Sequence, residues 1–134
     1  MNEHGSRVDE LQERLIAFAV SIVEIASQLP RTHSGRHVYK QIIRSGSATA
    51  ANYGEARAAE SKSDFIHKLR IVLKELNETA VWLQIITRCS LVRQEKVVAI
   101  VAENQELPDH WSIGANRTKL GIAIRNYWST QSEL

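Results

Sequence analysis

Side chains suited to a helix core recur along the segment 65–86 at alternating steps of four and three residues. The series is Phe65, Leu69, Val72, Leu76, Thr79, Leu83 and Ile86. This spacing is typical of a helix that packs lengthwise against other helices, whereas a strand requires alternation of period two. We therefore predict a long helix over this segment, opened by Ser61 and Asp64 as a capping pair.

The same spacing appears upstream, between residues 11 and 29. Its members are Leu11, Leu15, Phe18, Ile22, Ile25 and Leu29. Ser6 and Asp9 form a capping pair before this series, and Pro30 is expected to end the helix. A second apolar row, made of Ile16, Val20 and Val23, widens the apolar surface. We therefore expect this helix to be covered on more than one side.

Two further helices complete the pattern. One is expected over residues 33–59, and its middle (45–51) is a run of small side chains that lets a neighbouring helix approach closely. The other follows an apolar pattern over residues 97–128, which continues across Pro108, so we predict a long fourth helix kinked near Pro108. Four helices with short connections predict an all-α, antiparallel, up-down four-helix bundle.

Length and composition are those of one globular domain. With 134 residues, 43% of them hydrophobic, the chain is expected to fold as a single domain over 1–134, with disordered ends at 1–7 and 129–134. Its single cysteine, Cys89, cannot form an internal disulfide and is interpreted as a buried small hydrophobe. No segment resembles a signal peptide or a membrane span, so we expect a cytoplasmic protein with no membrane contact.

Basic side chains form rows on the predicted second and third helices. As a candidate nucleic-acid surface we single out Arg31, Arg36, His37, Lys40, Arg44, Arg70 and Lys74. Rows of one sign on adjacent helices attract phosphates, most strongly when an oligomer repeats them. The net charge of +2 is compatible with a polyanionic partner but does not require one. No aromatic side chain interleaves with the rows, which disfavours sequence-specific binding of a single strand.

On the predicted third helix, Glu75 and Glu78 fall between apolar neighbours, where an uncompensated group is costly to bury. On the second helix, Asn52 and Glu55 lie one turn apart on a single face. One hypothesis is a structural polar network that fixes the alignment of the helices or a subunit contact. The alternative is a carboxylate-lined, metal-binding bundle. Di-iron bundles use Glu-x-x-His motifs, and the nearest sequence here is Asp64-x-x-His67, so we favour the structural role and expect no metal, no cofactor and no catalytic residue.

Several motifs together resemble a known family. They are Gln41-Ile42-Ile43-Arg44-Ser45, Ala50-Ala51-Asn52-Tyr53-Gly54-Glu55-Ala56, Ser63-Asp64-Phe65, Lys74-Glu75-Leu76-Asn77-Glu78-Thr79 and Trp82-Leu83. They are similar to the signature of the "four helix bundle protein" family, typified by proteins encoded in intervening sequences of bacterial large-subunit ribosomal RNA genes. The accessory protein of diversity-generating retroelements is a distant relative. The resemblance spans about Val8 to Leu107.

The resemblance implies a bundle that assembles into a homopentameric ring and has no established enzymatic activity. It also implies contact with nucleic acid, RNA or DNA, or with a nucleic-acid enzyme, through basic surfaces. We therefore expect a non-enzymatic, oligomeric interaction or scaffold protein. The alternative is a purely structural homo-oligomer with no nucleic-acid role, and salt-dependent binding of nucleic acid distinguishes the two.

Overall fold

The computed structural model of the protein describes residues 3–107, and the side chains of residues 10–107. It contains four α-helices: α1 (Glu3–Ala26), α2 (His33–Arg57), α3 (Lys62–Arg88) and α4 (Gln94–Glu106). Within residues 3–107 there is no β-strand. The predicted all-α, four-helix class is therefore confirmed.

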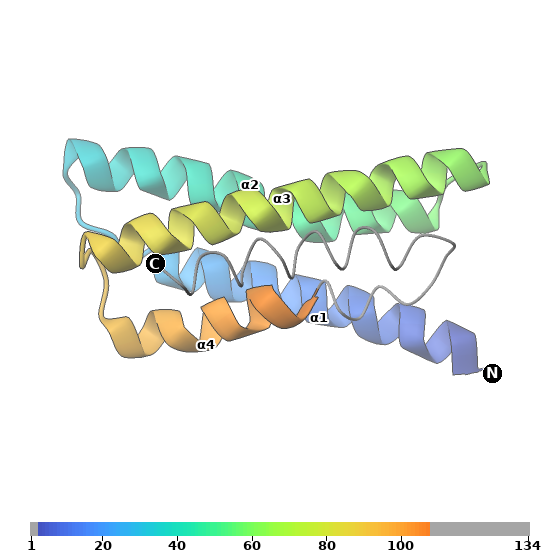
Figure 1. Ribbon diagram of the computed structural model, residues 1–134, viewed down its shortest axis with the longest axis horizontal. Coiled ribbons are helices and arrows are strands. Elements are labelled where there is room, and N and C mark those ends of the chain that lie inside the picture. Colours follow the sequence, from blue (N-terminus) through green and yellow to red (C-terminus); the bar gives the residue numbers. More distant parts are fainter. Residues whose placement is uncertain (1–2, 108–134) are drawn as a thin grey trace, which may run out of the picture.

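Consecutive helices run in opposite directions along a common long axis (Figure 1). The helices α1 and α2, α2 and α3, and α3 and α4 are in contact, and α4 also contacts α1, which closes the bundle. The α1–α2 and α3–α4 connections lie at the same end, on the left of Figure 1. Residues far apart in the sequence, around 30 and around 90, are thereby brought to one end of the molecule.

The core contains most of the two apolar series that the sequence predicts. Every member of the upstream series is buried, from Leu11 on α1 at 5% exposed to Leu29, just beyond α1, at 8%. On α3, Val72, Leu76 and Leu83 are at most 1% exposed. Near the beginning of α3, Leu69 is partly buried and packs against the core. The four-and-three spacing therefore identifies the inward face of both helices.

Small side chains bring α2 close to both of its neighbours. Ser45, Gly46 and Thr49 are buried on α2. A Cβ atom added at Gly46 would lie 2.7 Å from Cγ2 of Ile22, so the backbone of α2 touches the α1 side chain directly. Towards α3, the Thr79 hydroxyl donates to Ser45 Oγ at 2.9 Å, which satisfies both buried hydroxyl groups. The predicted close approach is therefore made with α1 at Gly46 and with α3 at Ser45.

Polar contacts fix α4 on the bundle. The Arg14 guanidinium donates to both carboxylate oxygens of Glu103, at 3.0 and 2.9 Å, and this bonding raises the pKa of Arg14. Asn104 is 1% exposed and donates from Nδ2 to the carbonyl of Leu76 at 3.2 Å. Together these contacts connect α4 to α1 and to α3.

Several helix ends differ from the predictions. α1 begins at Glu3, so Ser6 lies inside the helix rather than at its N-cap, and residues 3–7, which we expected to be disordered, are helical. It ends at Ala26, before Pro30, because the amides of Gln28 and Leu29 bond to carbonyls three residues back and tighten the last turn.

The remaining boundaries agree more closely. The Ser61 hydroxyl accepts from the Asp64 amide at 3.1 Å and caps α3, which confirms that capping prediction. The fourth helix begins at Gln94, three residues before the predicted start. Its predicted kink at Pro108 and its continuation lie outside the described residues. Cys89, expected to be buried, is exposed because it lies just beyond the last turn of α3.

Two glycines of α2 provide a test of the α1–α2 contact. In Gly46→Ala and in Gly54→Ala, the higher helix propensity of alanine stabilises the helix by a similar amount, about 1 kcal/mol. An added Cβ at Gly54 meets nothing within 4 Å, whereas at Gly46 it meets the buried Ile22 side chain. We expect Gly46→Ala to be less stable than Gly54→Ala by about 1–3 kcal/mol. Urea unfolding at one fixed protein concentration measures the difference, and equal midpoints would contradict the contact.

Candidate nucleic-acid interface

Part of the basic surface predicted from the sequence lies at the end of the bundle where the α1–α2 and α3–α4 connections meet. Arg31 lies in the first connection, and Arg36, His37 and Lys40 lie in the first two turns of α2. All four side chains are exposed. The stretch that joins α1 to α2 therefore presents its basic groups to solvent.

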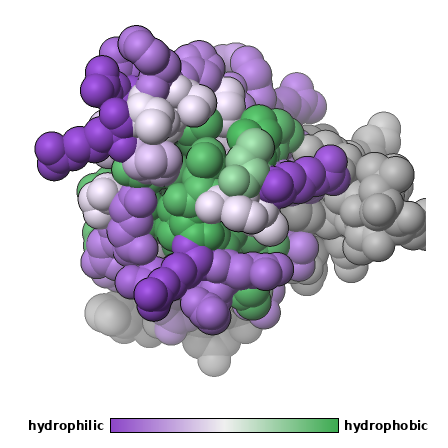
Figure 2. Space-filling model, turned by 90° about the vertical axis from the view of Figure 1, so that its left-hand side faces the viewer, coloured by the Kyte–Doolittle hydropathy of each residue, from purple (hydrophilic) through white to green (hydrophobic). Residues whose placement is uncertain are grey.

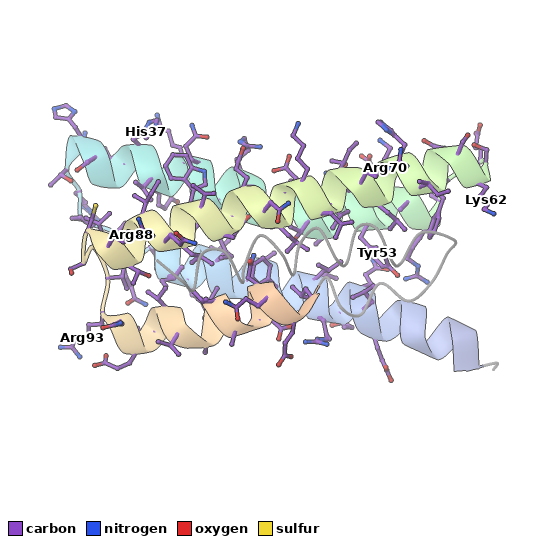
Figure 3. All side chains as sticks on the ribbon, viewed as in Figure 1. His37, Tyr53, Lys62, Arg70, Arg88 and Arg93 are labelled. Atoms are coloured by element: carbon purple, nitrogen blue, oxygen red, sulfur yellow. The ribbon has the colours of Figure 1, made fainter. Side chains whose placement is uncertain are left out.

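Further basic side chains join them from the other connection. Arg88 ends α3, Arg93 precedes α4, and Lys96 lies in the first turn of α4. All three are exposed. Figure 3 shows Arg88 and Arg93 at the same end as His37, opposite Lys62. We call the group Arg31, Arg36, Lys40, Arg88, Arg93 and Lys96 the basic end.

The surface predicted from the sequence did not include Arg88, Arg93 and Lys96. They do not extend either basic row, and they lie about 50 residues or more from Arg31 in the chain. The composition of two segments of the sequence could have indicated these residues. The two segments 26–40 and 84–98 carry all six Arg and Lys of the basic end and a single acidic residue, Glu95, in a chain whose net charge is only +2. Positive charge is therefore concentrated at one end of the bundle.

The cations of the basic end have no carboxylate partner among residues 10–107. Arg36 donates through Nη2 to the backbone carbonyl of Arg31 at 3.2 Å, and Arg88 donates to Gln84 Oε1 at 3.3 Å. Both acceptors are neutral, so the guanidinium charges stay uncompensated. The first turn of α2 contains no acidic residue either.

Arg44, predicted as part of the nucleic-acid surface, has a different environment. Its guanidinium pairs with Glu75, at 3.3 Å between Nη1 and Oε2, and with Glu78. Its charge is thus balanced by two carboxylates of α3, because α2 and α3 pack closely enough for their facing side chains to meet. Arg44 therefore connects two helices and is not part of the basic end.

The four residues predicted as one polar network form separate contacts. Glu75 and Glu78 share Arg44, while Glu55 pairs with Lys68 at 2.7 Å and raises the pKa of that lysine. Asn52 donates to the Ala48 carbonyl of its own helix at 2.8 Å. The structure therefore brings together Glu75 and Glu78 but joins neither to Asn52 or Glu55 through a hydrogen bond or ion pair.

Arg70 and Lys74 lie elsewhere on α3. Arg70 is 18 residues before Arg88, which corresponds to about 27 Å along a helix axis. Figure 3 shows Arg70 in the half of the bundle that contains Lys62. Both side chains are exposed. The predicted surface is therefore divided into the basic end and a separate pair of cations.

The basic end surrounds apolar surface. Figure 2 looks onto this end and shows hydrophobic atoms gathered at its centre, with hydrophilic side chains around them. A hollow of about 420 Å³ opens here between the α1–α2 connection and α2, and Leu29, Pro30, Arg36 and Tyr39 are among its lining residues. Charged groups and an apolar recess thus occur side by side.

No group of three or more His, Cys, Asp or Glu side chains among the described residues is placed to hold a metal ion. Asp64 and His67, the nearest sequence to a di-iron motif, lie at the start of α3, where His67 is exposed. As for membranes, none of the described helices combines the length and the apolar character that a bilayer span needs.

The fold and the surface define a small four-helix bundle whose distinguishing feature is a cluster of uncompensated cations at one end. A family model for the 23S rRNA-intervening sequence proteins matches residues 10–110. The chain belongs to that family, as its resemblance in the sequence predicted.

A solved structure supports the assignment. It is a protein of unknown function from the S23 ribosomal protein family of Bacteroides thetaiotaomicron, 37% identical in sequence, with a TM-score of 0.68. The match covers 72% of this chain and 90% of that one. The comparison with curated proteins gives no match.

The role of Arg44 can be tested by removing its charge. Arg44→Gln is expected to lower the free energy of unfolding by about 0.5–1 kcal/mol, because Arg44 is half exposed but the side chain of Glu75 is only 14% exposed and loses its cation. Lys68→Gln is the control, with a smaller loss expected because the side chain of Glu55 is 59% exposed. Denaturant unfolding near neutral pH measures both. A wild-type midpoint for Arg44→Gln would contradict the structural role.

Proposed function

We propose that this protein is a non-enzymatic interaction module that binds the phosphate backbone of nucleic acid through its basic end. The observation that carries the proposal is the separation of charge. Arg44, in the middle of the α2–α3 contact, and Lys68, near the start of α3, are balanced by carboxylates, whereas the basic end has six cations and no carboxylate partner among the described residues.

Such a cluster suits a phosphate backbone for two reasons. Arginine presents several donors in a planar fork that matches phosphate oxygens, and four of the six cations are arginines. Neutralising phosphates releases condensed counterions, which makes binding favourable at low salt and independent of base sequence. The family description, which refers to an intervening sequence of 23S rRNA, supports a nucleic-acid partner.

We propose in addition that the protein acts as a homo-oligomer. Ile16, Val20 and Val23 recur at steps of four and three on α1 and are 41%, 51% and 47% exposed. They form a row on the side of α1 that faces away from the core. A row of this kind gains free energy when a second copy covers it. Assembly would also repeat the basic end, so that several copies contact one strand with increased avidity. The pentameric stoichiometry remains an expectation from the family likeness.

The nucleic-acid proposal is tested with two triple variants that remove equal charge. One combines Arg31→Gln, Arg88→Gln and Arg93→Gln and leaves Arg36 in place, because its bond to the Arg31 carbonyl holds the start of α2. The other, the control, combines Lys62→Gln, Arg70→Gln and Lys74→Gln. Each lost phosphate contact lowers the slope of log K against log salt by about 0.7–0.9. We expect a reduction of about 2–3 for the first variant and little change for the second.

Electrophoretic shift and fluorescence anisotropy over a series of salt concentrations measure these slopes. A loss confined to the control variant would assign binding to the predicted row on α3 instead. If the wild-type protein shifts no nucleic acid even at low salt, the proposed function is wrong and the purely structural alternative stands.

The oligomer proposal is tested with Val20→Glu. A carboxylate at this position would have to be buried without a partner in any interface that covers the row, so we expect the mass in solution to fall towards the protomer value of 15.1 kDa. Ala51→Glu, at an exposed position on α2, adds the same charge as a control. Sedimentation velocity at micromolar concentration decides. A wild-type protein that sediments as a monomer would refute the proposal.

A further inference from the structure

The hollow at the basic end is built by a tight junction between the α1–α2 connection and the start of α2. A Cβ atom added at Gly35 would lie 1.9 Å from the Pro30 carbonyl oxygen, so only glycine allows this approach. The Thr32 hydroxyl accepts from the Gly35 amide at 3.1 Å and caps α2, which holds the connection in place. The hollow is therefore a formed feature of the fold, and its volume of about 420 Å³ lies in the range of small-ligand sites.

An aromatic ring stands on one wall of this hollow. Tyr39 follows Gly35 by one helical turn, lines the hollow, and is 43% exposed. Among residues 10–107 no ring contact involves Tyr39. By contrast, the ring of Trp82 packs against that of His37, with 5.7 Å between the ring centroids. One face of an exposed aromatic ring in an apolar recess is a platform on which a planar group can stack.

The same hollow is bordered by cations. Arg31 and Arg36 both line it. No carboxylate among the described residues pairs with either of them, and one nitrogen of Arg36 is held by the Arg31 carbonyl at 3.2 Å. A ligand that fits this surface needs a flat, largely apolar part for the recess and negative charge on either side of it.

An unpaired nucleobase between two phosphates has this chemistry. Proteins that bind single strands combine a positive surface that follows the backbone with aromatic side chains on which bases stack. In a duplex the bases are stacked within the helix and cannot enter a recess, so the hollow distinguishes single-stranded from double-stranded nucleic acid. The sequence disfavoured sequence-specific binding of a single strand, because no aromatic side chain interleaves with the basic rows. Tyr39 lies beside the rows on α2, and it lines the hollow because the α1–α2 connection packs against the start of that helix.

We propose that the basic end binds single-stranded nucleic acid by taking one unpaired base into the hollow against the ring of Tyr39, while Arg31 and Arg36 contact the flanking phosphates. This inference rests on the proposed function, since it requires that the basic end contacts nucleic acid at all. Base identity is not read, because the recess offers stacking and few polar groups.

The test compares Tyr39→Leu and Tyr39→Phe with the wild-type full chain. The probes are a 20-nucleotide oligouridine, the matching oligothymidine, an RNA duplex of equal length and an abasic single strand, each measured by anisotropy at one fixed salt concentration. We expect Tyr39→Leu to bind the single strands about 5- to 100-fold more weakly, the loss that corresponds to stacking of one base. Tyr39→Phe should retain wild-type affinity, because the ring and not the hydroxyl group makes the contact.

Duplex and abasic probes separate stacking from electrostatics. We expect the leucine variant to bind both as the wild type does, with an unchanged salt slope, because its charge is unaltered. Since Tyr39 is exposed, a circular dichroism melt should show an unchanged midpoint for both variants. The two single strands show whether the 2′-hydroxyl contributes, and equal losses on both support stacking alone.

Two results would overturn the inference: a leucine variant that binds single strands as tightly as the wild type, or one that loses affinity equally for the duplex and the abasic strand. In either case the triple arginine variant still reports on the basic end. A weakened arginine variant together with an unaffected Tyr39→Leu variant rejects only the base-stacking step. A wild-type protein that binds none of the four probes rejects the proposed function as well.

Discussion

The close packing of α2 between α1 and α3 is the constraint on which the rest of the structure depends. Gly46 lets the α2 backbone touch Ile22, and the hydroxyl pair of Ser45 and Thr79 fills the opposite contact without leaving a buried polar group unpaired. Larger side chains at Ser45 or Gly46 would force the helices apart. Because three long helices are held at this spacing, both connections at one end converge, and the basic end exists only as a result.

Charge is arranged differently along the bundle. In the middle of the α2–α3 contact, facing helices place Arg44 next to Glu75 and Glu78, so opposite charges cancel within the protomer. At the end of the bundle, the chain turns back, and no carboxylate in the described part of the chain pairs with Arg31 or Arg36. A modest net charge can therefore coexist with a strong local field, because the field at a surface depends on the local excess and not on the total.

Periodicity in the sequence predicted the fold class and most of the core. Val72, Leu76 and Leu83 are buried because a helix repeats its inward face every three to four residues, a property that is local to the segment. The capping role of Ser61 was predictable because it too is local, since the amide that it accepts from is only three residues away. The N-terminal boundary of α1 was not, because a polar first turn at Ser6 is compatible with both a cap and a helix interior.

The candidate site was predictable only in part, because its members depend on tertiary packing. Arg31, Arg36 and Lys40 were found because they are close in sequence, whereas Arg88 and Arg93 join them only after the helices have packed. The ion pairs of Arg44 were not predictable, because its carboxylate partners lie on another helix, more than 30 residues away. Cys89 was misplaced because the α3 helix ends at the preceding residue, where an apolar pattern no longer specifies an inward direction.

The position of Cys89 makes the protein well suited to site-specific spectroscopy. It is the single cysteine of the chain, it is exposed, and it follows Arg88 directly. A maleimide dye would therefore attach at one defined place beside the basic end without any engineered substitution. Its emission would respond to a polyanion arriving there. In an assembly, stepwise photobleaching of the same dye would count the copies, so one thiol would report on both occupancy and stoichiometry.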